Sequence, residues 1–218
     1  MGQARLLVVG EPTGNRMLAG HKGALWLRAC CRGVTAHGST PHLGDNAVYK
    51  AARGIARLED FEFNAAAHPV MGRPTLNVGT VSGGLNINSV PDLAEFTIDI
   101  RTVPGMRHDT VRDQIGFTLG EGTELQSLVD LPSVWSDPGR PEMRRAITAF
   151  MAATGREAPP TSANYFTDAS VLTPALGNVA TIICGPGDPA MAHKTDEYCD
   201  VAAIGEAVEI YRSIIRSA

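Results

Sequence analysis

The sequence predicts an α/β protein in which one compact unit is inserted into another. An apolar strand at residues 5–10 stands alone near the N-terminus. Residues 24–131 then alternate strand and helix patterns in a self-contained order, and residues 137–215 form a separate series of helices and strands. Because a strand as apolar as 5–10 needs neighbours in a sheet, we expect it to join the C-terminal series in one α/β layer.

The inserted unit has the predicted order β-α-β-β-α-β, with strands at 24–32, 75–81, 94–101 and 123–131 and helices at 47–60 and 108–119. Strand 94–101 alternates apolar and polar residues, and Asp45 or Asn46 can cap the first helix. This order is typical of a ferredoxin-like unit, in which a four-stranded antiparallel sheet carries two helices on one face. Its first helix and a sheet edge would offer a natural dimer surface.

The C-terminal layer is predicted from helices at 141–154, 168–176 and 201–215, a strand at 178–184, and a strand or loop at 159–166. Residues 14–20 are interpreted as a linker. These assignments predict two domains. The α/β domain combines residues 1–20 and 132–218, and the inserted domain covers residues 21–131.

Composition excludes several function classes. The formal net charge is −4 and no cluster of Lys or Arg occurs, which argues against a nucleic-acid partner. No apolar run approaches the roughly 20 residues needed to cross a bilayer, and no signal peptide is recognisable. Cys30 and Cys184 lie in apolar strand patterns, which suggests buried free thiols in a reducing compartment. We therefore expect a soluble cytoplasmic protein with no membrane partner.

Polar side chains follow two of the apolar strands. Glu11 comes directly after strand 5–10, and His193 lies in the Gly/Pro-rich loop 185–197 after strand 178–184. Loops at the ends of core strands are where α/β proteins hold ligands and catalytic groups. Alternatively, Glu11 only precedes Pro12 in a turn, and His193 is a solvated loop residue.

Six short motifs occur in one order across nearly the whole chain: Gly10-Glu-Pro-Thr13, Gly33-Val-Thr-Ala-His-Gly38, Gly79-Thr-Val-Ser-Gly-Gly84 with Asn88-Ser-Val-Pro-Asp92, Asp99-Ile-Arg101, Thr167-Asp168, and the His193 loop. In these motifs the chain resembles the metallo-aminoacylase family that includes acetylornithine deacetylase, succinyl-diaminopimelate desuccinylase and carboxypeptidase G-like metallopeptidases. The resemblance implies a zinc-peptidase-like α/β catalytic domain interrupted by a ferredoxin-like lid, which mediates homodimerisation.

The resemblance also implies a dinuclear metal site. Glu11 would be a carboxylate ligand of one zinc ion and His193 an imidazole ligand of the other, which are donor types that Zn²⁺ binds. Two zinc ions would activate a bridging water for attack on an amide carbonyl. Cobalt or manganese would also suit these donors.

Four further residues match positions with roles in the family. His37 would reach the partner subunit's active site and stabilise the oxyanion, while Asn88 and Arg101 of the lid would hold the substrate. Thr167 would bind substrate near the catalytic cleft. The alternatives are a solvated loop histidine, a turn asparagine, an arginine in a surface ion pair and a threonine that caps a helix.

The sequence departs from the family pattern before Glu11. The family's His-x-Asp segment, bridging Asp and Glu-Glu pair precede the Glu-Pro-Thr motif, but the ten residues before Glu11 contain no His, Asp or Glu. We therefore expect this chain to be the C-terminal portion of a longer hydrolase and to be inactive alone. The parent enzyme would cleave N-acyl amino acids or small peptides with a free carboxylate; deacetylase, desuccinylase and dipeptidase activities stay open.

Two other functions are consistent with parts of the sequence. The chain could be a non-catalytic module for dimerisation or for binding an N-terminal partner. A ferredoxin-like amino-acid-sensing domain would explain residues 24–131, but it would leave Glu11 and the His193 loop without a role.

Overall fold

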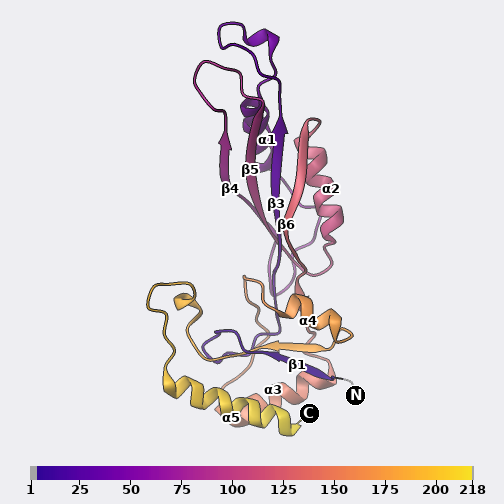
Figure 1. The fold of residues 1–218 in the computed structure, drawn as a ribbon. Coiled ribbons are helices and arrows are strands. Elements are labelled where there is room, and N and C mark those ends of the chain that lie inside the picture. Colours follow the sequence, from indigo (N-terminus) through magenta and orange to yellow (C-terminus); the bar gives the residue numbers. More distant parts are fainter. Residues whose placement is uncertain (1–3, 218) are drawn as a thin grey trace. The chain divides into compact units, whose positions relative to one another are not determined.

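The computed structural model describes residues 4–217, which fold as two compact units (Figure 1). The terminal unit combines the N-terminal segment up to Lys22, the short segment His68–Gly72 and the segment from Ser133 onward. The central unit comprises Gly23–Ala67 and Arg73–Pro132. The chain is thus an α/β protein with an inserted unit, as the sequence predicts.

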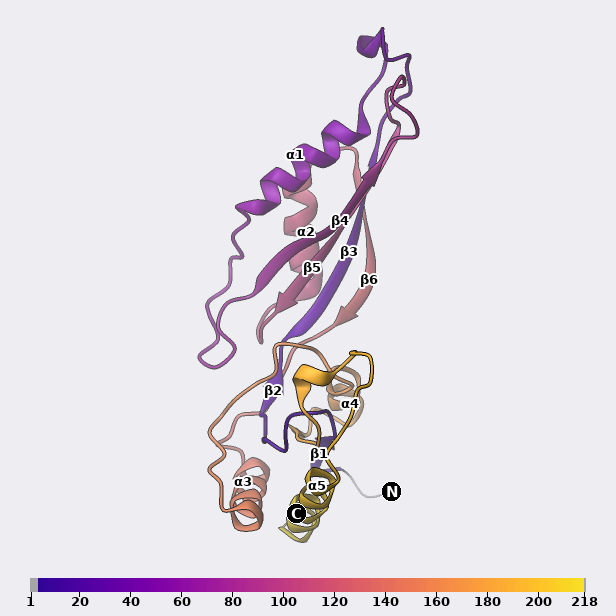
Figure 2. The same cartoon turned by 90° about the vertical axis from the view of Figure 1, so that its left-hand side faces the viewer.

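The central unit is built on a four-stranded antiparallel sheet in the order β4-β5-β3-β6. Helices α1 and α2 cover one face of this sheet (Figure 2). The elements are β3 (Gly23–Arg32), η1 (Pro41–Leu43), α1 (Ala47–Glu59), β4 (Thr75–Gly83), β5 (Leu93–Thr102), α2 (His108–Leu119) and β6 (Thr123–Leu131). Their order confirms the ferredoxin-like prediction. Helix α1 begins where Asn46, one of the two candidate caps, accepts the Tyr49 N–H at 3.1 Å.

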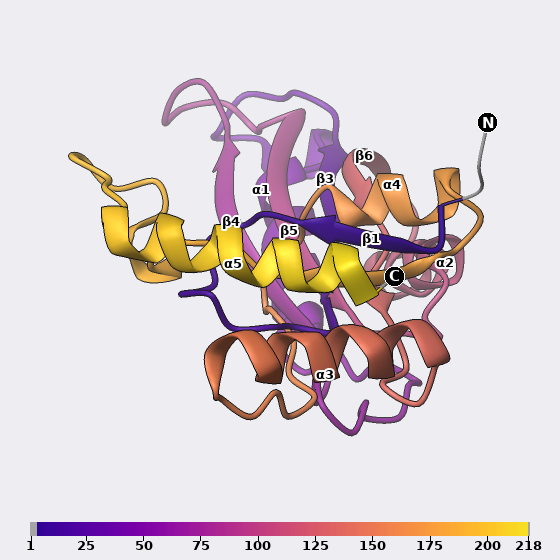
Figure 3. The same ribbon diagram turned by 90° about the horizontal axis from the view of Figure 1, so that it is seen from below.

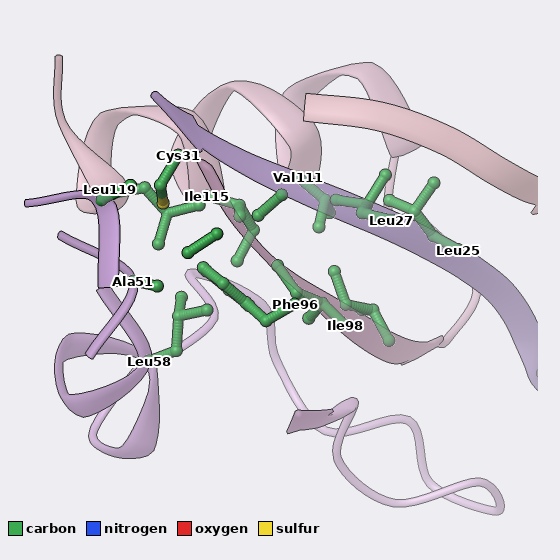
Figure 4. Packing of buried hydrophobic residues seen from close by; sticks show 14 residues of the cluster. Leu25, Leu27, Cys31, Ala51, Leu58, Phe96, Ile98, Val111, Ile115 and Leu119 are labelled. Carbon is green, nitrogen blue, oxygen red and sulfur yellow. The ribbon is translucent and has the colours of Figure 1, made fainter. Parts of the chain in front are cut away.

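The core of the central unit follows from the alternation along β5. Phe96, Ile98 and Ile100 are at most 1% exposed and pack with β3, α1 and α2. Figure 4 shows these apolar side chains gathered between the sheet and the helices. Each large side chain buried in this way contributes about 1.5–3 kcal/mol through removal of apolar surface from water. The intervening residues Asp99 and Arg101 therefore lie on the opposite, helix-free face of the sheet.

The same alternation corrects the prediction for Cys30. Cys31 is buried and joins the core, whereas Cys30 lies on the opposite face, only partly buried, with its Sγ 3.2 Å from Glu95 Oε1. Adjacent residues around positions 30 and 31 are apolar, so the sequence pattern does not show which of the two cysteines points into the core. All four cysteines are free thiols, and Cys184 is buried as predicted.

In the terminal unit, β1 (Leu6–Val9) pairs in parallel with β8 (Ala180–Ile183). Helices α3 (Pro141–Thr154) and α5 (Val201–Ser217) pack together beside this pair (Figure 3). The remaining elements are β2 (Gly20–His21), β7 (Val134–Trp135), α4 (Ala169–Ala175) and η2 (Pro189–Met191). Strand β1 thus joins the C-terminal layer, as its apolar sequence predicts.

Residues 14–20 are not the linker that their composition suggests. Met17, Leu18 and Ala19 are buried, and Leu18 exchanges backbone hydrogen bonds with Ile183 at 2.9 and 3.0 Å. The segment then continues as β2, which pairs with β7. Although a glycine stands at either end, the segment is not a flexible linker, because its apolar side chains are buried against β8.

The segment His68–Gly72 belongs to the terminal unit although it lies between α1 and β4 in the chain. Met71 is buried, and the His68 ring meets the Trp135 ring edge-on at 4.7 Å between centroids. The observed division therefore differs here from the continuous range 21–131 expected for the inserted domain. No helix within residues 4–217 is long and apolar enough to span a bilayer.

Replacing Phe96 with alanine should lower the free energy of unfolding of the central unit by about 3–5 kcal/mol, because a fully buried ring is lost. Urea denaturation would measure the change. Phe117→Ala is the matched control, since its side chain is 91% exposed and its loss should have little effect. Equal effects of the two substitutions would contradict the proposed core.

Candidate active site

Parallel pairing of β1 and β8 brings the Glu11 turn and the His193 loop to the same edge of the sheet. Both strands end there, since Leu6–Val9 are aligned with Ala180–Ile183. The Cys184 N–H donates to the Val9 carbonyl at 3.0 Å, and the Gly185 carbonyl accepts the Thr13 and Asn15 N–H groups at 3.1 and 2.9 Å. The carboxyl edge of a parallel sheet is the usual place for a ligand site in an α/β protein.

The contact between the two turns requires glycine at position 185. A Cβ atom there would lie 2.5 Å from the Gly10 carbonyl oxygen and 2.6 Å from that of Glu11. Both are backbone atoms, so neither can move aside without displacing the turn that carries Glu11. Gly185, the first residue of the His193 loop, is thus needed for the two turns to pack closely.

Glu11, Asp168 and His193 share one electrostatic environment. Partial burial raises the pKa of the Glu11 carboxyl, the negative charge of Asp168 raises it further, and His193 lowers it. The pKa of Tyr165 is raised by burial and then by the charge of Glu11. The structure therefore brings together the two predicted metal ligands and adds two side chains that the sequence argument did not assign to the site.

Tyr165 and Asp168 approach the Glu11 turn from the segment that leads into α4. The Tyr165 hydroxyl donates to the Pro12 carbonyl at 3.0 Å, which ties this segment to the turn. Their neighbour Thr167 is 4% exposed, and its Oγ1 accepts the Ala169 N–H at 3.1 Å. Thr167 thus acts as a helix cap here, and Asp168 is the member of the Thr-Asp pair whose charge acts on Glu11.

The His193 loop has an unusual backbone. His193 and Asp196 adopt positive φ angles of 63° and 60°, a left-handed conformation that is uncommon for residues with a side chain. The Glu197 carboxylate accepts the His193 N–H at 3.1 Å and stabilises this conformation. The imidazole itself is left exposed to solvent.

In the central unit, the loops that carry His37 and Asn88 lie side by side. The Gly38 N–H donates to the Asn88 carbonyl at 2.7 Å, and His37 and Ser89 form an isolated antiparallel bridge. The His37 Nδ1 lies 2.7 Å from the Ser39 hydroxyl, and the ring is largely exposed. Two of the predicted functional residues are thus brought together by loop pairing.

Arg101 is not part of this pair of loops. The Asn88 loop leads into the first residue of β5, whereas Arg101 lies at the other end of that strand. Its Nε forms an ion pair with Asp99 at 2.9 Å, and its guanidinium lies 5.8 Å from the centroid of the Trp26 ring. A planar guanidinium held in this way keeps a defined orientation on the helix-free face of the sheet.

Glu11 and His193 have the chemistry of metal ligands but are too few to form a site by themselves. Within the described part of the chain, no group of three or more His, Cys, Asp or Glu side chains could hold a metal ion. A catalytic zinc site in a protein ordinarily has three protein ligands. The described residues therefore supply at most part of the ligand set.

Gly185→Ala should destabilise the terminal unit by at least the roughly 1–3 kcal/mol typical of overpacking, because backbone atoms must shift. Thermal or urea unfolding would test this. Gly205→Ala is the matched control within α5, where nothing lies within 4 Å of the added Cβ. That change should stabilise the helix by about 0.5–1 kcal/mol. A neutral Gly185→Ala variant would refute the close contact.

Glu11→Gln should raise the melting temperature of the chain at pH 7 in the presence of a chelator. The folded state raises the pKa of Glu11 above its ordinary 4.5, so stability from this group is full below pH 4.5 and is lost as pH rises through the folded pKa. The gain should therefore vanish at pH 4. The exposed control Glu157→Gln should show no gain; a gain that persists at pH 4 would contradict the electrostatic explanation.

Comparison with known proteins relates this geometry to a family. Residues 19–122 match the family described as "Peptidase dimerisation domain". The chain is 31% identical to an acetylornithine deacetylase of Myxococcus xanthus, covering 92% of this chain and 54% of the relative. It is 28% identical to a probable carboxypeptidase of Neosartorya fischeri, covering 97% and 48%. The chain thus spans about half the length of these curated relatives.

Solved structures show the same fold. The chain superposes on aminopeptidase PepT of Bacillus cereus with a TM-score of 0.79 at 19% identity, covering 98% of this chain and 57% of that one. For an M20 family metallo-carboxypeptidase of Sulfolobus solfataricus the TM-score is 0.74 at 15% identity, with 98% and 63% covered. Residues 19–122 therefore match the peptidase dimerisation domain family, and the chain as a whole is similar to an acetylornithine deacetylase and to probable carboxypeptidases over about half of their length.

Proposed function

We propose that the protein functions as a metal-dependent amidohydrolase that cleaves N-acyl amino acids or small peptides with a free carboxylate. The observation that carries this proposal is the placement of Glu11 and the His193 loop at one edge of the β1–β8 pair. The names of the relatives, a deacetylase and several carboxypeptidases, support hydrolysis of an amide next to a carboxylate. Deacetylase, desuccinylase and dipeptidase activities are all compatible with this site.

Glu11 and His193 would each supply one ligand to a different divalent metal ion, and residues outside this chain would supply the others. Zinc is the proposed metal, while cobalt and manganese suit the same donors. Such ions, when bound, supply an activated water and polarise the amide carbonyl. Tyr165 would hold the Glu11 turn in place through its hydrogen bond to the Pro12 carbonyl, and the negative charge of Asp168 would add to the attraction of the site for a cation.

The central unit would supply the groups that bind the substrate. The exposed His37 imidazole can donate to the oxyanion formed during hydrolysis, and Asn88, held beside it, can hydrogen-bond the substrate. Arg101 would bind a substrate carboxylate, because a planar guanidinium suits a bidentate grip on that group. In this proposal His37 acts in the active site of a second subunit. Thr167 would act through the backbone position of Asp168.

A homodimer would form through the β4 edge and helix α1. Strand β4 has the sequence TLNVGTVSG, with no charged residue and no proline to discourage pairing with another strand. The other edge strand, β6, carries Glu124 and Asp130. Tyr49 of the neighbouring helix α1 is 63% exposed and would add one large side chain to this surface. A cytoplasmic location would be consistent with the four free cysteines.

A second candidate function is that of a non-catalytic partner-binding module. One observation favours it: helix α5 exposes Val201, Ile204, Val208 and Ile215 at spacings that place them on one face. An apolar stripe of this kind is suited to cover by further polypeptide. The two functions differ in one respect, because the module would bind that polypeptide without any hydrolytic activity in the assembly.

In an enzyme of the relatives' length that contains this chain, Glu11→Ala and His193→Ala should each reduce kcat/KM for N-acetyl amino acids. The loss should exceed the roughly 10–100-fold typical of changes outside the ligand shell. Metal content measured in parallel should fall as well. The exposed Glu157→Ala control should retain both properties. Wild-type turnover by either ligand variant would overturn the assignment, and an inactive wild-type assembly would favour the module.

A further inference from the structure

The helix-free face of the central sheet carries a cluster of three side chains that includes Arg101. Asp99 and Arg101 are two residues apart on β5 and therefore lie on the same face of the sheet. Trp26 of β3 is the direct cross-strand partner of Asp99, and β3 and β5 are the two inner strands (Figure 1). The pairing register of these strands thus places an indole, a carboxylate and a guanidinium side by side.

The Asp99 carboxylate is bonded to both of its neighbours. Its Oδ1 lies 2.9 Å from the Arg101 Nε, and its Oδ2 accepts a hydrogen bond from the Arg101 Nη2 at 2.9 Å. The Trp26 Nε1–H also donates to Oδ1, at 2.9 Å. Because two oxygens hold two nitrogens of one guanidinium, the pair fixes the plane of that group as well as its position.

Trp26 contacts the guanidinium as well as the carboxylate. The Arg101 Cζ lies 5.8 Å from the centroid of the Trp26 ring, within the range of a cation–π interaction. The side chains of Arg101 and Asp99 are 24% and 36% exposed, so water and salt screen this ion pair less than a fully exposed one. The indole therefore supports both members of the pair, the carboxylate through its N–H and the guanidinium through its ring.

We propose that Asp99 and Trp26 are positioning residues that hold the Arg101 guanidinium in the orientation that binds the substrate carboxylate. The inference rests on the proposed function, in which Arg101 binds that group. A free arginine side chain loses rotational freedom when it binds a ligand, and this loss weakens binding. Asp99 and Trp26 order the side chain before the substrate arrives. Their replacement should therefore weaken substrate binding and leave the chemical step unchanged.

Steady-state kinetics with N-acetyl amino acids test this proposal in an enzyme of the relatives' length that contains this chain. Asp99→Asn keeps the size of the side chain and an oxygen for the Trp26 N–H, but it removes the negative charge that holds Arg101. KM should rise about 10-fold, the effect of losing one charge-assisted hydrogen bond, while kcat stays within about 2-fold. Trp26→Phe keeps an aromatic ring and loses only the N–H donor, so it should raise KM by a smaller factor.

A double-mutant cycle shows whether Asp99 acts through Arg101. In an Arg101→Gln background, Asp99→Asn should cause no further loss of kcat/KM, because the guanidinium that it positions is gone. Additive losses, or a fall in kcat with KM unchanged, would overturn the proposal. A wild-type KM in Arg101→Gln would instead overturn the substrate-binding role of Arg101. A raised KM in that variant but not in Asp99→Asn would overturn the positioning role alone.

The matched control is Asp109→Asn in the first turn of α2. Asp109 also forms an ion pair with an arginine two residues away, Arg107, but that pair is exposed and lies outside the cluster. The control should keep the wild-type KM. An equal rise in KM would overturn the proposal, because the effect would then follow from loss of any aspartate–arginine pair. Melting temperatures of the 218-residue versions would show that each variant is folded, and Trp26→Phe provides the test if Asp99→Asn is not.

Discussion

The close backbone contact between Gly185 and the Gly10–Glu11 turn is the constraint on which the candidate active site depends. It joins two segments that are about 175 residues apart in the chain, and it exists only because position 185 has no side chain. Parallel pairing of β1 and β8 sets the direction of both turns, and the contact then fixes their separation. Glu11 and the His193 loop therefore lie in the same environment.

The electrostatic environment of Glu11 is a second constraint on the candidate site, besides the packing of the two turns. Burial and the charge of Asp168 raise the pKa of Glu11, while His193 lowers it; on balance the ionised carboxylate carries a cost that a positive charge can compensate. A bound cation would supply that compensation. The strained left-handed backbone at His193 has the same character, since a conformation of that kind persists only where surrounding contacts hold it. Both features cost some stability in the folded chain.

Much of the fold was predictable because the signals are local. Alternation along β5 defined both faces of the central sheet, and the position of Asn46 marked the start of α1. The pairing of Leu18 with Ile183 was not predictable, because it depends on residues distant in sequence. The same holds for the site: Glu11 and His193 were recognisable by their positions after strands, whereas the influence of Asp168 on Glu11 arises only from the tertiary fold.

The central claim is that this chain carries one ligand for each of two metal ions, and that other residues complete the site. Native mass spectrometry of the 218-residue chain after incubation with zinc tests it most directly. The account predicts no tightly bound zinc, because the described residues contain no cluster of three or more potential ligands. Two zinc ions retained per chain would show that residues of this chain complete the ligand set, and they would contradict the account.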